Sequence, residues 1–167
     1  MRLITAIFLF VLLIPTAGWS QADEVVQVYA FYAPGVRTST LGSPSETTVQ
    51  FGFGGDFSLS DRLRLGGEVG YVGRHENVFN SGLGVLSGNV SYLIGSNETW
   101  TPFVTVGYTR FFNLLAGANG MNLGGGTHIQ LWKKLGLRVE FRDQIGWGNR
   151  QTQHFLGVRF GPVFTFN

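Results

Sequence analysis

The chain has 167 residues, a formal net charge of +2 and no cysteine. This length suffices for one domain with a core, whereas the small net charge argues against nucleic-acid binding, which requires a basic stripe. Without cysteine, a disulfide scaffold, a thiolate metal site and a cysteine nucleophile are excluded.

The composition departs from that of soluble proteins. Charged residues make up 13% of the chain, against roughly a quarter in a typical soluble domain. Glycine is abundant at 25 residues, and aromatic residues reach 14%. The mean hydropathy of +0.13 is nevertheless too low for a bundle of membrane helices. These values predict strands with one apolar face and one face of small or polar residues.

The first 22 residues have the pattern of an export signal. A basic start, Met1-Arg2, precedes an apolar run over residues 3–14, and Ser20-Gln21-Ala22 offers small residues for a signal peptidase. We predict a cleaved signal peptide over 1–22, with cleavage after Ser20 as the second choice, and a single domain over 23–167. A retained membrane helix is the alternative, but the run is shorter than the ~20 residues of a span.

The remaining chain alternates apolar and polar residues between breaks rich in Gly, Asn, Ser and Asp, which predicts strands. In the second strand, for example, Phe51 and Phe53 lie opposite Gln50 and Gly52. The eight predicted strands span about residues 24–33, 47–59, 62–72, 81–93, 101–112, 121–132, 135–143 and 153–166. Each is about as long as the ~9–11 residues that a tilted strand needs to cross a bilayer. Eight strands can close into a barrel, which removes the sheet edges.

The composition of the polar face indicates which face is outside. A soluble barrel has the same alternation with its apolar face inward, and it remains the alternative. A face turned to bulk water would carry many Lys and Glu, whereas this face is mostly Gly, Ser, Thr, Asn and Gln. We therefore predict an all-β fold: an eight-stranded antiparallel up-and-down transmembrane β-barrel with its apolar face toward lipid.

Export would place both ends of the barrel in the periplasm. The breaks at Ser60-Asp61, at 95–98 and at Lys133-Lys134 then become periplasmic turns. The breaks at 34–44, 73–80, 113–120 and 145–152 become external loops. All are short, so a large extracellular binding head is not expected.

The seventh strand, Leu135 to Asp143, carries the densest charge. Leu137, Val139 and Phe141 share its apolar face, and an acid between two arginines shares the other. Because strands three and seven stand opposite each other in an eight-stranded barrel, we predict an ion-pair network inside the lumen. Its predicted members are Glu68, Arg138, Glu140, Arg142 and Arg159, with Arg64 and Asp56 nearer the periplasmic end. The network would fill the interior; the alternative is a gate in a narrow pore.

The whole segment 23–167 resembles the small outer-membrane β-barrel proteins of Gram-negative bacteria, the OmpA/OmpX-like eight-stranded barrels. The segments 121–126 (MNLGGG) and 135–143 (LGLRVEFRD) resemble the penultimate hairpin of such domains. The last strand alternates apolar residues and ends in Phe166, followed by Asn167. The resemblance implies that Phe160, Phe164 and Phe166 form the signal read by the barrel-assembly machinery.

Other candidate sites are weaker. His75, His128 and His154 have no metal-ligand spacing, and the glycine runs at 52–55 and 124–126 lead into no helix and precede no Lys. We expect no metal and no cofactor. Six aromatic residues near strand ends should form girdles at the membrane interfaces: Trp100, Tyr108, Phe111, Phe112, Trp132 and Trp147.

The expected function is a non-enzymatic, structural role in the cell envelope, at the outer membrane. The alternatives are a narrow, porin-like pore for ions or small solutes and a lipid-modifying enzyme at the outer rim, near His75 and His154. Expected partners are outer-membrane lipid, lipopolysaccharide (through Arg110 and Arg150 at the rim) and the assembly machinery. We expect a monomer that binds no nucleic acid.

Overall fold

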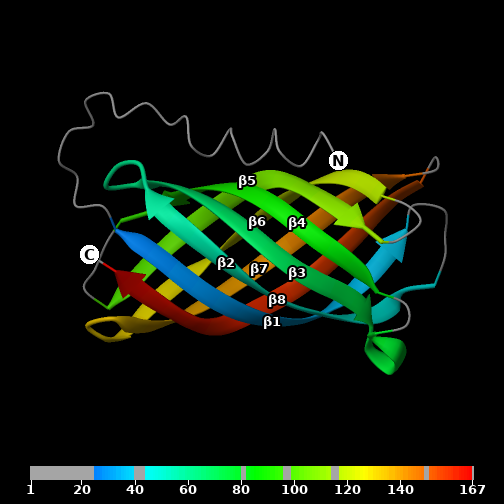
Figure 1. Cartoon of the computed structure of the whole chain (residues 1–167), viewed down its shortest axis with the longest axis horizontal. Coiled ribbons are helices and arrows are strands. Elements are labelled where there is room, and N and C mark those ends of the chain that lie inside the picture. The colour runs from blue at the N-terminus through cyan, green and yellow to red at the C-terminus, as the bar shows by residue number, and fades with distance from the viewer. Residues whose placement is uncertain are drawn as a thin grey trace, which may run out of the picture.

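The structure is a computed structural model that describes residues 25–39, 44–79, 82–95, 99–113, 117–148 and 151–166. The predicted signal peptide lies outside these residues. Eight strands form one closed barrel in chain order, each antiparallel to its neighbours, with β1 paired to β8 (Figure 1). The fold predicted from the sequence is confirmed. The strands are β1 (Val26–Ser39), β2 (Glu46–Ser58), β3 (Leu63–Arg74), β4 (Leu83–Leu93), β5 (Trp100–Phe112), β6 (Gly117–Trp132), β7 (Leu135–Gly148) and β8 (Gln151–Phe166).

The two ends of the barrel differ. At the turn end, where β1 begins and β8 ends, strands are joined by tight connections such as Lys133-Lys134. Leu63 donates a backbone hydrogen bond to Ser60 Oγ in the β2–β3 connection. At the opposite, loop end, a short 3-10 helix, η1 (His75–Asn77), follows β3. No helix among the described residues is both long and apolar enough to cross a membrane.

The outer surface of the barrel is apolar. Phe53, Val69 and Leu86 are neighbours in the β2–β3–β4 register, and 66%, 53% and 54% of their surfaces are exposed. On β7, Phe141 is exposed, whereas Leu137 and Val139 are half-buried. The intervening residues point into the lumen and are buried, as alternation along a strand requires. The polar face is therefore inside, as the composition predicted.

Several strands extend beyond their predicted ends toward the loop end. β1 continues through Pro34 and Gly35 to Ser39, and these residues pair with β2. Likewise β6 begins at Gly117, and β7 continues to Gly148. The sequence predicted loops here because these segments are rich in Gly, Asn and Pro, which is the composition of loops. The structure shows that this prediction is wrong. In a closed barrel each strand has a neighbour on both sides, and backbone pairing continues where the apolar alternation has stopped.

One predicted girdle residue is also placed differently. Trp100, Tyr108, Phe112, Trp132 and Trp147 are exposed on the outside, but only 2% of Phe111 is exposed. Phe111 stacks on Phe155, with ring centroids 5.1 Å apart, in a small apolar cluster at the loop end of the lumen. Phe111 has the same parity as the inward-facing Thr105 and Thr109, so alternation outweighs its position near a strand end.

Candidate functional site: the lumenal ion-pair cluster

Strand alternation points a set of charged side chains into the middle of the barrel. We call this set the ion-pair cluster, and at most 5% of any member's surface is exposed. It draws on β1, β2, β3, β7 and β8, which are neighbours across the β1–β8 seam. Its members are Tyr29, Asp56, Glu68, Arg138, Glu140, Arg142 and Arg159.

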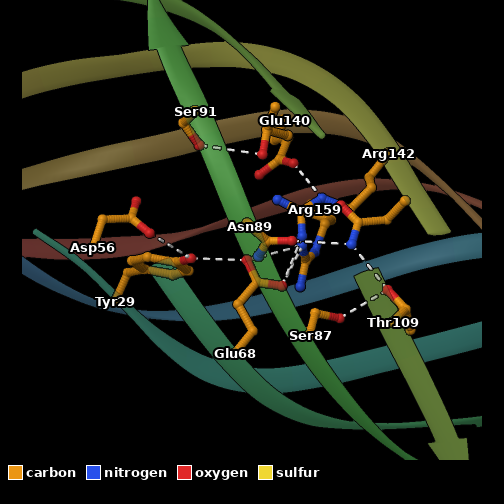
Figure 2. Close-up of polar contacts among 12 residues, drawn as sticks. Tyr29, Asp56, Glu68, Ser87, Asn89, Ser91, Thr109, Glu140, Arg142 and Arg159 are labelled. Carbon is orange, nitrogen blue, oxygen red and sulfur yellow. Dashed lines mark hydrogen bonds and ion pairs between the residues drawn. The ribbon is translucent and has the colours of Figure 1, made fainter. Parts of the chain in front are cut away.

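Glu68 on β3 is the centre of the cluster. Its carboxylate accepts hydrogen bonds from Arg142 Nη1 at 2.7 Å and from Arg159 Nη1 at 3.0 and 3.2 Å. The Tyr29 hydroxyl donates to Glu68 Oε1 at 2.7 Å and lies 3.4 Å from Asp56 Oδ1. Figure 2 shows Tyr29 between the two acids, with Arg142 and Arg159 beyond Glu68. A single carboxylate thus joins β1, β3, β7 and β8.

Glu140 on β7 holds the two arginines of its own strand. Arg138 Nε donates to Glu140 Oε2 at 3.0 Å, and Arg142 Nε donates to Glu140 Oε1. These residues are two apart along the strand, so they share a face. Arg138 also donates to Asp56 Oδ2 on β2 at 2.8 Å, across the lumen. The acid between two arginines therefore fixes the direction of both guanidinium groups.

Aromatic rings cover two of the three guanidinium groups. The Arg159 guanidinium carbon lies 3.6 Å from the centroid of Phe31. Arg138 lies over both Tyr29 and Phe103, at 4.4 and 4.5 Å from the ring centroids. Such cation–π contacts strengthen when they are removed from water. They give the arginines a second set of partners where the hydrogen bonds do not reach.

The cluster is electrically balanced, because its three carboxylates face three arginines. Burying an isolated charge is costly, and a buried pair is tolerated only when its geometry and hydrogen bonds compensate for lost hydration. Each acid here has at least one arginine within 3.0 Å. The arrangement can therefore fill the lumen with charge while carrying no net charge of its own.

Two glycines leave room for this filling. A Cβ at Gly54 on β2 would lie 2.6 Å from the Tyr29 ring, and a Cβ at Gly124 on β6 would lie 2.9 Å from Glu140 Oε1. Real Cβ atoms do not approach other atoms that closely. The strands next to these long side chains must therefore be bare at these positions.

The β4–β6 wall is polar but uncharged. Ser87 lies 2.9 Å from Thr109, and the Ser91 hydroxyl donates to Thr105 at 3.1 Å. Asn122 Nδ2 donates to Asn89 Oδ1 and to Thr109 Oγ1, both at 2.9 Å. We call this set the hydroxyl–amide ladder: Ser87, Asn89, Ser91, Thr105, Thr109 and Asn122 (Figure 2). It completes the lining of the lumen opposite the ion-pair cluster.

The structure brings the five predicted lumenal residues, Glu68, Arg138, Glu140, Arg142 and Arg159, into contact. Asp56 bonds to Arg138, whereas Arg64 lies apart and donates to Gln27. Sequence reasoning missed Tyr29 and Phe31 as lumenal partners. Their signal was present, because both share the parity of Gln27, which points inward. Adjacent apolar residues in the same strand obscured it.

The remaining predicted residues lie outside the cluster. Phe160, Phe164 and Phe166 are on the outer face of β8, each between 44% and 52% exposed. His128 lines the turn end of the lumen, His75 lies in η1, and His154 lies on β8 with Nδ1 2.8 Å from Asp143 Oδ2. Among the residues that the structure describes, no three His, Cys, Asp or Glu side chains are grouped so that they could hold a metal ion.

Comparisons with known proteins identify the fold. No model of a known protein family matches the chain, and no curated protein sequence matches it. Among solved structures, Neisserial surface protein A is 12% identical with a TM-score of 0.66, over 84% of this chain and 97% of that one. Ail of Yersinia pestis is 10% identical with a TM-score of 0.57, over 87% and 100%. The N-terminal β-barrel domain of Pseudomonas aeruginosa OprF is 16% identical with a TM-score of 0.55, over 85% and 97%. The chain thus has the fold of the small eight-stranded outer-membrane barrels.

Proposed function

We propose that the protein is a non-enzymatic integral barrel of the Gram-negative outer membrane with a structural role in the envelope. The observation that carries this proposal is the inverted distribution of polarity. Large apolar side chains cover the outside, and the charged side chains of the ion-pair cluster are buried inside. This distribution suits a lipid solvent, because a soluble protein rarely exposes a contiguous apolar surface of this extent.

Membrane fractionation tests the location. The protein should be found in outer-membrane fractions and should migrate faster on a gel before heating than after. A soluble periplasmic product with no mobility shift would overturn the proposal.

A substitution on the outer face tests whether this face contacts lipid. Val69→Arg places a charge on the outer face near the middle of β3. In lipid this costs about 2–4 kcal/mol of unfolding free energy. Val69→Leu is the matched control, and an equal stability of the two variants would contradict a lipid-facing surface.

The filling of the lumen by the ion-pair cluster supports a structural role over a pore. The ion-pair cluster contacts strands on opposite sides of the barrel, and the cavities beside it hold only about 10 Å³ each. Such a volume accommodates about one water molecule. In planar bilayers the protein should show no steady discrete openings. Regular openings that change in size in the Glu140→Gln variant would favour the alternative, a narrow pore gated by the cluster.

A lipid-modifying enzyme at the rim is the third candidate. The pairing of His154 with Asp143 resembles the base and orienting acid of such enzymes. Among the described residues, however, Asp143 is the only side chain hydrogen-bonded to His154, and no hydroxyl nucleophile joins the pair. The lipid composition of cells producing His154→Ala should therefore equal that of cells producing the unaltered protein. A loss of a modified lipid would support the enzyme instead.

The proposed partners follow from the outer surface. We place the turn end in the periplasm, so that the loop end faces lipopolysaccharide. There Arg37 and Arg74 share Glu46, each at 2.5 Å, which leaves one positive charge for a phosphate group. The exposed Phe160, Phe164 and Phe166 would be read by the barrel-assembly machinery. A monomer is expected, and its size can be measured by light scattering in detergent.

A further inference from the structure

The turn end of the lumen contains a cavity separate from the ion-pair cluster. Its volume is about 290 Å³, far larger than the cavities beside the cluster. Only Val25 among its lining residues is apolar, and no lining residue is acidic. His128 forms part of its inner wall and packs against Phe103, with centroids 4.8 Å apart. Phe103 in turn contacts Arg138, so the inner wall of the cavity borders the ion-pair cluster.

The cavity is lined by two cationic side chains that form no ion pair with any described residue. These side chains are Arg64 and Lys133. The three buried carboxylates are already occupied by Arg138, Arg142 and Arg159. A cavity with charge of one sign and low-dielectric walls concentrates ions of the opposite sign.

Two nitrogen atoms of the lining side chains are buried and have no partner among the described residues. Arg64 Nη1 donates to Gln27, but the buried Arg64 Nε has no hydrogen-bond partner among the described residues. His128 Nδ1 is buried without a partner too, on a side chain that is only 8% exposed. Both atoms are closed to solvent, so a ligand in the cavity would meet the other atoms of these side chains.

The other lining side chains suit hydroxyl groups. Gln27 donates to Thr165 at 3.2 Å, and Gln130 and Thr101 complete the polar wall. Amides and hydroxyls both donate and accept hydrogen bonds, which is what a polyhydroxylated ligand requires. A volume near 300 Å³ is at the lower end for small-molecule sites, and it fits a ligand of monosaccharide size.

We propose that this cavity is a binding site for a small hydroxylated oxyanion, such as a sugar phosphate or a sugar carboxylate. Arg64 and Lys133 bind the anionic group, and Gln27, Gln130, Thr101 and Thr165 bind the hydroxyl groups. This inference goes beyond the proposed structural function and does not depend on it, because binding can be measured on the isolated barrel. Such a site would give the turn end a role in ligand binding, in addition to the structural role proposed for the barrel.

The test is an NMR titration of the protein purified from membranes into detergent micelles, with glucose 6-phosphate as the probe. Saturable shifts are expected at the side-chain amides of Gln27 and Gln130 and at the His128 ring. Glucose and inorganic phosphate, added separately, should bind at least 10-fold more weakly than glucose 6-phosphate. The absence of saturable shifts with glucose 6-phosphate would overturn the proposal, and so would shifts at the loop end only.

Lys133 and Lys134 supply a matched pair of variants. Both are exposed in the same turn, but only Lys133 lines the cavity. Lys133→Gln should weaken glucose 6-phosphate binding about 10-fold, whereas Lys134→Gln should change it less than 2-fold. If the two variants weakened binding equally, the binding would be due to general surface charge, and the proposed site would be wrong. Arg64→Gln, checked for folding by heat-dependent gel mobility, should weaken binding at least as much as Lys133→Gln.

Discussion

The two halves of the lumen are both filled by polar side chains, but of different chemistry. The half built from β1–β3, β7 and β8 uses long charged side chains that reach across the barrel, as from Arg138 to Asp56 and from Arg142 to Glu68. The half built from β4–β6 uses short hydroxyls and amides that bond within these three strands, as between Ser91 and Thr105 and between Asn122 and Asn89. Short side chains on one wall provide the space that long ones from the other wall occupy.

This contrast predicts which half of the lumen contributes more to the free energy of unfolding. Removing one member of a buried ion pair leaves an uncompensated charge, which costs more than a lost neutral hydrogen bond. Glu68 accepts from two arginines and a tyrosine, whereas Ser91 has one partner in the hydroxyl–amide ladder. The charged half should therefore respond to substitution strongly and cooperatively across the whole cluster, and the uncharged half weakly and one hydrogen-bonded pair at a time.

Glu68→Gln should have the largest effect. It removes the negative charge between Arg142 and Arg159, and the expected loss is about 3–5 kcal/mol of unfolding free energy. Urea unfolding in lipid vesicles measures this loss. The control is Glu46→Gln, a half-buried residue at the rim whose pairs with the partly exposed Arg37 and Arg74 contribute about 0–1 kcal/mol. Similar losses for the two variants would remove the distinction between a buried cluster and rim charges.

Asn122→Ala should have the largest effect in the uncharged half. Its amide donates to both Asn89 and Thr109, and none of its surface is exposed, so the expected loss is about 1–3 kcal/mol. Asn119→Ala is the comparison, because Asn119 accepts from Tyr108 and Arg110 on the exposed outer face. Should Asn122→Ala cost as much as Glu68→Gln, the ranking of the two halves would be wrong.

A double-mutant cycle sharpens the claim of cooperativity. Glu140→Gln and Arg142→Gln disrupt the same ion pair, so their effects on unfolding should be non-additive by about 0.5–3 kcal/mol. Glu140→Gln combined with Arg37→Gln should be additive, because Arg37 contacts Glu46, ten residues along β2 from Asp56. Unchanged heat stability in Glu140→Gln alone would refute the idea that the cluster holds the barrel together.

The smallest effect is expected from replacing both members of one ladder pair. In the double variant Ser91→Ala, Thr105→Val, both hydroxyls of the 3.1 Å hydrogen bond are lost together, and no partner is left unsatisfied in that pair. Such a replacement is close to neutral, whereas Thr105→Val alone should cost about 0.5–1.5 kcal/mol. Urea midpoints of the single and double variants provide the measurement. A double variant less stable than the single one would show that the ladder acts as more than separate pairs.

The sequence predicted the fold well because alternation and composition carry the same information. Gly, Ser, Thr and Asn opposite Val, Leu and Phe indicate both the strands and which face is inside. Strand ends could not be predicted as well. Pro34 and Gly35 look like loop residues, yet they pair with β2 because the barrel provides a neighbour at that height. Pairing of this kind depends on the register between strands that are distant in sequence, and local composition carries no information about that register.

Two properties of the candidate site could be predicted from the sequence: which side chains point inward, from their parity, and which strands face each other, from the topology. The opposition of strands three and seven places Glu68 across from Arg138 or Arg142, and the structure pairs it with Arg142. The hydrogen bonds of Tyr29 and the stacking of Arg159 on Phe31 depend on side-chain directions inside a crowded space. Parity would have placed Phe111 inside as well, but its position near a strand end suggested an interface instead.

The sequence separation within the ion-pair cluster affects how the barrel can form. Glu68 is 74 residues from Arg142 and 91 residues from Arg159, so these contacts exist only after the last strands meet the first. An open sheet would leave Asp56 and Glu68 without arginine partners near one edge, and three arginines with Glu140 as their one acid near the other. Such a state is disfavoured by its unpaired charge as well as by its exposed edges. Completion of the ring is therefore the step at which the charges become neutralised. The long-range ion pairs of the cluster therefore stabilise the closed barrel and not the open sheet that precedes it.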